Sequence, residues 1–303
     1  MNKILSHIIL FLLSLVALLP LRALYGLSDG IKFILFRVAG YRRKVVDANL
    51  RRCFPEKSEA ERKKIASGFY TTLCDNIVET VKLLHISDRE LQHRVKVSGV
   101  EHIEALAAQN RPIILFIGHF GNWEWVQELT SRYTHPAING ELYKPTRGEV
   151  SGRVVGKIRS RFASRNIAIP QAKAVRTLLA MRQQYGTFLI GFIADQRPPH
   201  TNMKHWMTFM GQDTPFAVGG EEIGNHIDAG YLYLDISRPR RGQYFFQIKT
   251  IEPSAADVDF PYTRGYMRLL EQSIRREPHL WLWSHKRWKN APSVTDNQAE
   301  NLK

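Results

Sequence analysis

The chain has 303 residues, of which 44% are hydrophobic and 23% charged, and its formal net charge is +15. This length allows one large domain or two small ones, and the composition excludes a disordered or fibrous protein. The charge favours acidic partners such as nucleic acid, anionic lipid headgroups, phosphorylated substrates or an acidic protein. Two cysteines, Cys53 and Cys74, make no disulfide framework and no metal-ligand spacing, so we expect free thiols in a reducing compartment.

The N-terminus contains an uncharged run, "IILFLLSLVALLPL", at residues 8–21. A spanning helix needs about 20 apolar residues, whereas runs of about 10–14 are more often interfacial, buried or signal-like. "LRALYG" is a poor cleavage site, and Lys3 is the only early charge, so a cleaved signal peptide is not favoured. We predict a retained membrane anchor over residues 1–40, either a short span or an interfacial segment, and one domain over 41–303.

Basic residues follow this anchor at once. They are Arg42, Arg43, Lys44, Arg51 and Arg52. Positive charge next to an apolar segment usually stays on the cytoplasmic side and attracts anionic lipid. We therefore expect the rest of the chain to face the cytoplasm.

The segments after the anchor alternate between helical and strand-like patterns. Residues 58–85 predict one long helix, because Ser58 and Glu61 form a capping-box pattern and apolar residues recur at helical spacing. The elements expected next are strand 94–99, helix 100–110, buried strand 112–118, helix 123–133 capped by Asn122, strand 137–143, basic helix 148–165, helix 173–185, buried strand 187–194, a hairpin of strands 231–237 and 244–252, and helix 261–276. This order predicts an α/β fold with a mixed central sheet flanked by helices and a helical N-terminal section.

Ionisable residues follow both buried strands. His119 comes just after the first, and Asp195, Gln196 and Arg197 come just after the second. In open α/β sheets, ligands gather at the carboxyl ends of the strands. We therefore predict a functional site where these two strands end.

The stretch "GHFGNWEW" holds His119 and Glu124 five residues apart. On a regular helix that spacing separates side chains by about 140°, so the two meet only if His119 lies in the loop and a helix begins near Trp123. Gly118 and Gly121 make such a sharp turn accessible. A histidine held by a carboxylate is the base and its orienting partner in general-base catalysis. The stretch contains no Ser or Cys, so the nucleophile is more simply a hydroxyl of the substrate.

A block of positive charge lies in the middle of the chain. Its members are Lys144, Arg147, Arg153, Lys157, Arg159, Arg161 and Arg165, with Glu149 the only acid among them. Such a block is either a solvated helix face or a binding site for phosphate or an acidic protein, since arginine binds those groups through two parallel hydrogen bonds.

The segment 198–216, rich in Met, Trp and Phe, is either a packed loop or a hydrophobic lid over an acyl-chain pocket.

Several motifs of the chain resemble those of a known family. "GHFGNWEW" resembles the His-x4-acid motif of the glycerolipid acyltransferase superfamily, and within it the late lauroyl and myristoyl acyltransferases of lipid A biosynthesis. Five further stretches are similar, in the family's order along the chain: "ANLRRCFPEKSEAERKKIASGFYTTLCDNIVET", "LYKPTRGEVSGRVVGKIRSRFASRNI", "IADQRP", "FMGQDTPFAVGG" and "EPHLWLWSHKRWK". The likeness covers nearly the whole chain.

The resemblance implies an enzyme of the bacterial inner membrane whose catalytic domain faces the cytoplasm. It would transfer an acyl chain from acyl carrier protein, or coenzyme A, to a hydroxyl of a lipid A precursor, with no metal and no cofactor. His119 would be the base and Glu124 its orienting partner. The substrate site would include Asn122, Lys144, Arg159, Arg161, Asp195, Gln196 and Arg197.

Two alternatives stay open from the sequence. The first is the same chemistry on another bacterial glycolipid or an aminolipid. The second is a non-catalytic protein that binds anionic membranes through its charge. A nucleic-acid partner is not expected, because the basic residues lack the interleaved aromatic residues of a known binding module.

Overall fold

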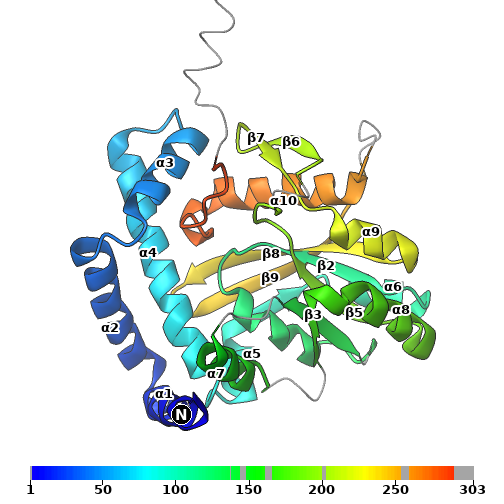
Figure 1. Cartoon of the computed structure of the whole chain (residues 1–303), viewed down its shortest axis with the longest axis horizontal. Coiled ribbons are helices and arrows are strands. Elements are labelled where there is room, and N and C mark those ends of the chain that lie inside the picture. Colours follow the sequence, from blue (N-terminus) through cyan, green and yellow to red (C-terminus); the bar gives the residue numbers. More distant parts are fainter. Residues whose placement is uncertain are drawn as a thin grey trace, which may run out of the picture.

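The computed structural model describes residues 2–136, 138–143, 148–160, 166–199, 203–253 and 259–289. A seven-stranded sheet lies at its centre, with strand order β1-β9-β8-β2-β5-β3-β4 (Figure 1). The strands are β1 (Val95–Ser98), β2 (Ile113–Ile117), β3 (Asn139–Tyr143), β4 (Asn166–Pro170), β5 (Leu189–Ile193), β8 (Gly230–Arg240) and β9 (Gln243–Thr250). Every neighbouring pair is parallel except β8 and β9, which form an antiparallel hairpin. The predicted α/β fold with a mixed sheet is confirmed.

The centre of the sheet is covered on both faces. All five residues of β2 are buried, as expected for a continuous apolar strand in a parallel region. Phe116 stacks on Tyr266 with ring centroids 4.8 Å apart, and Tyr266 belongs to α10 (Pro261–Arg276). The other helices around the sheet are α5 (Asp88–Arg94), α6 (Val100–Ala108), α7 (Glu149–Arg159), α8 (Ala174–Tyr185) and α9 (Gly219–His226).

The long helix α4 (Glu59–Lys82) begins as the sequence predicts. Ser58 accepts a hydrogen bond from the backbone N–H of Glu61, and the Glu61 carboxylate accepts one from the backbone N–H of Ser58. This reciprocal cap satisfies two of the N–H groups that a helix start leaves unpaired.

The N-terminal section consists of α1 (Asn2–Leu18), α2 (Leu21–Lys32), the π-helical η1 (Phe33–Val38) and α3 (Arg43–Cys53). Within the described residues, no one helix has the length and apolar character to cross a membrane. The segments Asn2–Leu18 and Leu21–Val38 meet that requirement only when taken together, and they are bent by 119° at their junction.

Polar contacts hold this section on α4, on the left in Figure 1. The Lys82 ammonium donates to the carbonyls of Ala17 and Leu19, both at 2.9 Å, where α1 ends. From α2, Ser28 donates to the buried carboxylate of Asp75 at 2.7 Å, and Tyr25 donates to Glu79 at 2.7 Å. These bonds turn the polar side of the section inward, while large apolar side chains of α1 face outward. The exposed ones are Ile4, Leu5, Ile8, Phe11, Leu12, Leu15 and Leu18.

The structure differs from the sequence predictions in a few elements. The segment after Asn122 is a 3-10 helix, η2 (Trp123–Ser131), rather than an α-helix, although Asn122 caps it as expected by accepting from the N–H of Trp125. Strand β4 was not predicted, because its apolar run is only a few residues long and Ile169 is its only buried residue. The segment 198–216 contains a hairpin, β6 (Trp206–Phe209) and β7 (Gln212–Pro215), and α9 was also not predicted. Two short 3-10 turns, η4 (Gln171–Lys173) and η6 (Pro278–Leu280), complete the order.

Candidate active site

Two neighbouring parallel strands place His119 and Asp195 at the same level. In the register of β2 and β5, Ile117 is paired with Ile193, and each functional residue lies two positions beyond its strand's last residue. The side chains meet there: Nδ1 of His119 lies 2.6 Å from Oδ1 of Asp195. The two strand ends therefore lie together, as expected from the sequence, and bring these two side chains into contact.

Three donors hold the Asp195 carboxylate in place. Besides the imidazole, Oδ2 accepts from the backbone N–H of His119 at 3.0 Å and from the indole N–H of Trp281 at 2.8 Å. The side chain is almost fully buried, and burial acts to raise its pKa. The charge and hydrogen bond of His119, with the bond from Trp281, outweigh that effect and hold the pKa of Asp195 below its usual range.

The same contact fixes the state of the imidazole. Because Asp195 is ionised, Nδ1 of His119 carries a proton and donates it, which leaves Nε2 as the basic nitrogen. The amide nitrogen of Gln196 lies 3.3 Å from this Nε2. Burial acts to lower the pKa of His119, but the Asp195 carboxylate and the charge of Glu124 overcome it and raise the pKa. The His119 side chain is 21% exposed, so a reactant can reach it.

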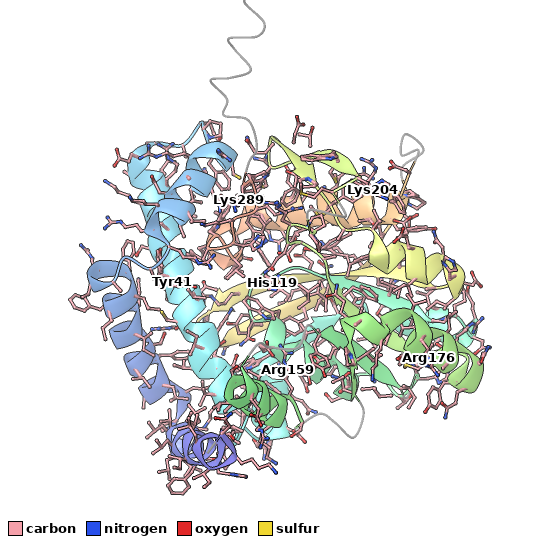
Figure 2. All side chains as sticks on the ribbon, in the orientation of Figure 1. Tyr41, His119, Arg159, Arg176, Lys204 and Lys289 are labelled. Carbon is pink, nitrogen blue, oxygen red and sulfur yellow. The ribbon has the colours of Figure 1, made fainter. Side chains whose placement is uncertain are left out.

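Glu124 does not make the hydrogen bond that the sequence predicted. Asp195 occupies that place on the imidazole, and Glu124 instead receives two parallel bonds from Arg159 of α7, 3.0 Å from Nε to Oε2 and 2.6 Å from Nη2 to Oε1. The planar guanidinium matches a carboxylate in this arrangement. Glu124 lies in the first turn of η2, and it acts on His119 through its charge. Figure 2 labels His119 near the centre of the molecule and Arg159 below it.

The turn between His119 and η2 requires its glycines. Gly121 has φ of +60°, and a Cβ there would lie 2.6 Å from Cγ2 of Ile236. A Cβ on Gly118 would lie 2.7 Å from Cδ1 of Leu270. A larger residue at Gly121 would press against β8 and strain the backbone, and one at Gly118 would press against α10, so the small residues favour this placement of His119.

Side chains from α4 also support this turn. Asn76 donates to the carbonyl of Gly121 at 2.7 Å, and Asn122 donates to Glu79 at 2.6 Å. Asn122 is 0% exposed, and its other amide atom caps η2. In this conformation Asn122 therefore shapes the turn and presents no polar atom to a ligand.

The other residues predicted for the substrate site make no described contact with His119. The Nε atom of Arg197 lies 3.3 Å from the Met203 sulfur, and its Nη1 donates to the carbonyl of Lys289 at 3.2 Å. Lys144 and Arg161 lie outside the described residues, as do Arg147 and Arg165 of the basic block.

Sequence reasoning missed two groups that touch the site. Trp281, which donates to Asp195, lies in the stretch "EPHLWLWSHKRWK", whose resemblance to the family was the only available signal. Glu141 of β3 lies 4.0 Å from Arg159 and accepts a bond of 2.9 Å from Gln127. It adds a second acid to the Glu124–Arg159 pair, and no pattern in the sequence marks it.

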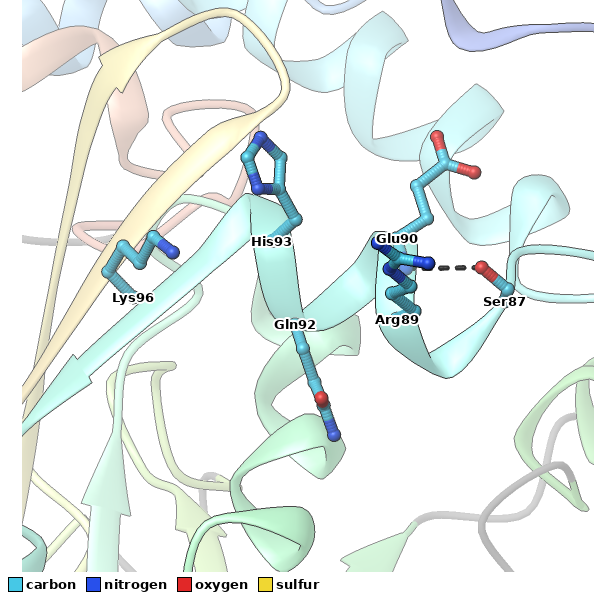
Figure 3. Close-up of a pocket in the computed structure, with 6 residues that line it drawn as sticks. All are labelled: Ser87, Arg89, Glu90, Gln92, His93 and Lys96. Carbon is cyan, nitrogen blue, oxygen red and sulfur yellow. Dashed lines mark hydrogen bonds between the residues drawn. The ribbon is translucent and has the colours of Figure 1, made fainter.

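Other parts of the described chain do not extend this site. No group of three His, Cys, Asp or Glu residues is arranged there to hold a metal ion. A surface hollow of ≈ 490 Å³ lies at α5 and β1 and is lined by Ser87, Arg89, Glu90, Gln92, His93 and Lys96 (Figure 3). None of the site residues lines it.

Comparison with known proteins decides the family. A model of the bacterial lipid A biosynthesis acyltransferases matches residues 2–290, which is nearly the whole chain. The chain belongs to this family. It is 36% identical over 289 residues to the lipid A biosynthesis lauroyltransferase of Escherichia coli K12, covering 92% of this chain and 89% of that protein.

Two further relatives match a smaller part of this acyltransferase. The lipid A biosynthesis palmitoleoyltransferase of E. coli K12 is 23% identical over 262 residues, 83% of this chain and 80% of that protein. The lipid A biosynthesis myristoyltransferase of the same organism is 34% identical over 71 residues, 23% of this chain and 22% of that protein. The resemblance inferred from the motifs is thereby confirmed at the level of the family.

The two acids near His119 in this acyltransferase have different expected effects on its protonation. The pKa of His119 should lie above the usual value of about 6.5. Asp195→Asn removes the charge and replaces a charge-assisted hydrogen bond to the protonated imidazole with a weaker neutral one, so it should lower the pKa of His119 markedly. Glu124→Gln removes only a charge, so it should lower the pKa of His119 less than Asp195→Asn does. NMR titration of ¹⁵N-labelled histidine, assigned with His119→Gln, measures both; a larger drop in Glu124→Gln would contradict the assignment of Asp195 as the main partner.

Proposed function

We propose that this acyltransferase moves an acyl chain from a thioester of acyl carrier protein, or of coenzyme A, to a hydroxyl of a lipid A precursor. His119 acts as the general base. The observation that supports this best is the bond between Nδ1 of His119 and Asp195, because it leaves Nε2 as the proton acceptor on a partly exposed ring.

The reaction proceeds by direct attack. Nε2 of His119 takes the proton of the acceptor hydroxyl as its oxygen forms a bond to the thioester carbonyl carbon. The tetrahedral intermediate then collapses, the carbon–sulfur bond breaks, and the imidazolium returns its proton to the leaving thiolate. Asp195 holds the ring and balances the imidazolium charge, in the role that the buried carboxylate has in hydrolase triads. No covalent acyl-enzyme is required.

Glu124 and Arg159 act together in this proposal. Their paired hydrogen bonds keep Glu124 in the first turn of η2, where its charge favours the imidazolium that forms during attack. Arg159 also brings a cation beside the reacting centre, where negative charge develops on the carbonyl oxygen. Two backbone donors of the turn are unsuited to that oxygen, since the N–H of His119 bonds to Asp195 and that of Gly121 bonds to the carbonyl of Leu280.

The substrate class follows from charge and from the relatives. The net charge of +15 suits a phosphorylated acceptor and an acidic carrier protein. The relatives described above are named for lauroyl, palmitoleoyl and myristoyl transfer in lipid A biosynthesis, which supports a medium or long acyl chain and a lipid A acceptor. Lys144, Arg161, Gln196 and Arg197 stay predicted contacts to these substrates.

We further infer that the enzyme is attached to the inner membrane with its site on the cytoplasmic side. The outward side chains of α1, together with Phe33, Ile34 and Val38 of η1, form an apolar surface that water solvates poorly. α1 and α2 are bent by 119° and bond to α4 through the Ala17 carbonyl and the Ser28 hydroxyl, so this surface suits insertion into one leaflet.

Replacing the base should abolish transfer. His119→Ala removes the proton acceptor, so the rate should fall about 10²- to 10⁴-fold. His226→Ala, which changes an exposed histidine of α9, is the matched control and should keep the wild-type rate. Purified enzyme is mixed with lauroyl- or myristoyl-loaded carrier protein and a lipid A precursor, and mass spectrometry follows the added acyl mass. Transfer by His119→Ala at the wild-type rate would contradict the assignment of His119 as the general base. Transfer only to another hydroxylated lipid would contradict the assignment of a lipid A precursor as the acceptor.

Membrane attachment should depend on the apolar face of α1. Phe11 is 64% exposed, so Phe11→Asp combined with Leu15→Asp adds two charges to that face at little cost to folding. The double variant should lose most of its binding to vesicles that contain anionic phospholipid, measured by co-sedimentation. Val175→Asp combined with Leu179→Asp, on exposed positions of α8, is the control and should bind like the wild type. Equal binding by all three proteins would contradict the proposed attachment.

A further inference from the structure

Arg287 is a buried cation beside the candidate active site. It is 1% exposed, and none of its three guanidinium nitrogens has a hydrogen-bond partner within the described part of the chain. A buried charge without hydrogen bonds is costly for a fold to keep. Neither the proposed mechanism nor the sequence motifs assign this residue a role, so its position calls for an explanation.

The backbone fixes Arg287 close to the catalytic loop. The segment that contains it runs along the loop of His119: the N–H of Leu282 donates to the carbonyl of His119 at 3.1 Å, and the indole of Trp281 donates to Asp195 at 2.8 Å. The chain then turns, with the N–H of Arg287 donating to the carbonyl of His285 at 2.9 Å. These bonds tie Arg287 to the segment that already supports both catalytic side chains.

The charges around Arg287 point to one carboxylate. Asp195 is the acid whose charge acts on the guanidinium, with a smaller effect from the hydroxyl of Tyr266 on α10, while Arg197 opposes them. Burial lowers the pKa of Arg287 to about 10, which still leaves it charged at neutral pH. Its charge is therefore balanced through space by Asp195, the same carboxylate that bonds to His119.

We propose that Arg287 is a positioning residue whose buried charge holds Asp195 ionised and limits how firmly His119 binds a proton. This inference rests on the proposed function, in which His119 must be neutral to accept the hydroxyl proton. Asp195 and Glu124 both favour the imidazolium and act to raise the pKa of His119, and a stronger preference for the imidazolium would leave less of the neutral base. Arg287 opposes that tendency from inside the fold, where solvent screens its charge little.

Other groups that face this cluster do not replace Arg287. Arg159 is bonded to Glu124 and offsets that acid. Burial and the charge of Arg287 lower the pKa of His285 to about 4, so His285 is neutral near pH 7. Arg42 acts on His285 and donates to the carbonyl of Ser284 at 2.9 Å, and Arg197 bonds to the carbonyl of Lys289. Within the described structure, Arg287 is thus the buried cation on which the charge of Asp195 acts.

The test compares Arg287→Met, Arg287→Gln and Arg287→Lys in the full chain in detergent, with NMR titration of ¹⁵N-labelled His119. Loss of the charge should raise the pKa of His119 by about one unit in the Met and Gln variants, whereas Lys keeps the charge and should stay near the wild-type value. Arg94→Met, which removes a cation paired with Glu90 on α5, is the control and should cause no shift. A pKa of His119 unchanged in folded Met and Gln variants would overturn the proposal.

The pH dependence of acyl transfer gives a second readout. The acid limb of the profile should move to higher pH in Arg287→Met and Arg287→Gln, by the same amount as the NMR shift. A purely structural role would lower the rate at every pH without moving the limb, and that result would also overturn the proposal. Because the NMR titration needs no substrate, a wild-type enzyme without transfer activity would count against the proposed function and leave this inference to be decided by NMR alone.

If Arg287→Met and Arg287→Gln do not fold, thermal unfolding of a double variant tests the proposal instead. If Asp195 and Arg287 balance each other, removing both charges is less harmful than removing one, so Asp195→Asn with Arg287→Met should recover a cooperative thermal transition. A double variant that unfolds as readily as Arg287→Met alone would show that the two charges are not coupled.

Discussion

The hydrogen bond between His119 and Asp195 is the interaction on which the rest of the site depends. It exists because β2 and β5 are adjacent and parallel, with Ile117 paired to Ile193, so that residues two positions further on face each other. A slip of one residue in this register would offset His119 from Asp195 by about 3.3 Å along the strands and turn one of them to the other face of the sheet, which would break the bond. The packing of the sheet therefore also sets the geometry of the base and its carboxylate.

Helix α4 connects this site to the N-terminal section. On one side, Asp75 and Glu79 accept bonds from Ser28 and Tyr25 of α2. On the other side, Glu79 accepts from Asn122 of the catalytic turn. Tyr244 of β9 donates to Glu79 as well, at 2.8 Å. Burial raises the pKa of Glu79 to about 6, and these three donors act against that effect. The section proposed to lie on the membrane is thus fixed to the loop that carries His119 through one buried carboxylate.

The sequence predicted those parts of the fold that have strong local signals. Residues 58–85 combine a capping box with helical apolar spacing, and β2 and β5 are continuous apolar runs, so these elements are found where expected. Strand β4 and the hairpin β6–β7 have only short apolar runs, and they lie at the edge of the sheet or outside it. Their existence depends on contacts with distant segments, which a local pattern does not record.

Only part of the candidate site could be predicted, because the rest of it depends on contacts between distant segments. Both strand ends could be identified, but the choice of acid for His119 could not. Glu124 is the nearer acid in sequence, whereas Asp195 lies 76 residues away and meets the imidazole only through the strand register. The Glu124 carboxylate instead accepts two hydrogen bonds from the guanidinium of Arg159. Trp281 and Arg287 come from a segment nearly 90 residues further along, which packs against the site only in the folded chain.

The most direct test of this account is the pH dependence of a single turnover, from a loaded acyl carrier protein to a lipid A precursor, in the wild type and in Asp195→Asn. The account predicts that the wild-type rate falls on acidification with the pKa that NMR assigns to His119. Asp195→Asn should react far more slowly at every pH, because its imidazole is no longer held with Nε2 toward the reactant. A rate that is independent of pH, or an Asp195→Asn variant as fast as the wild type, would contradict the central role of the His119–Asp195 pair.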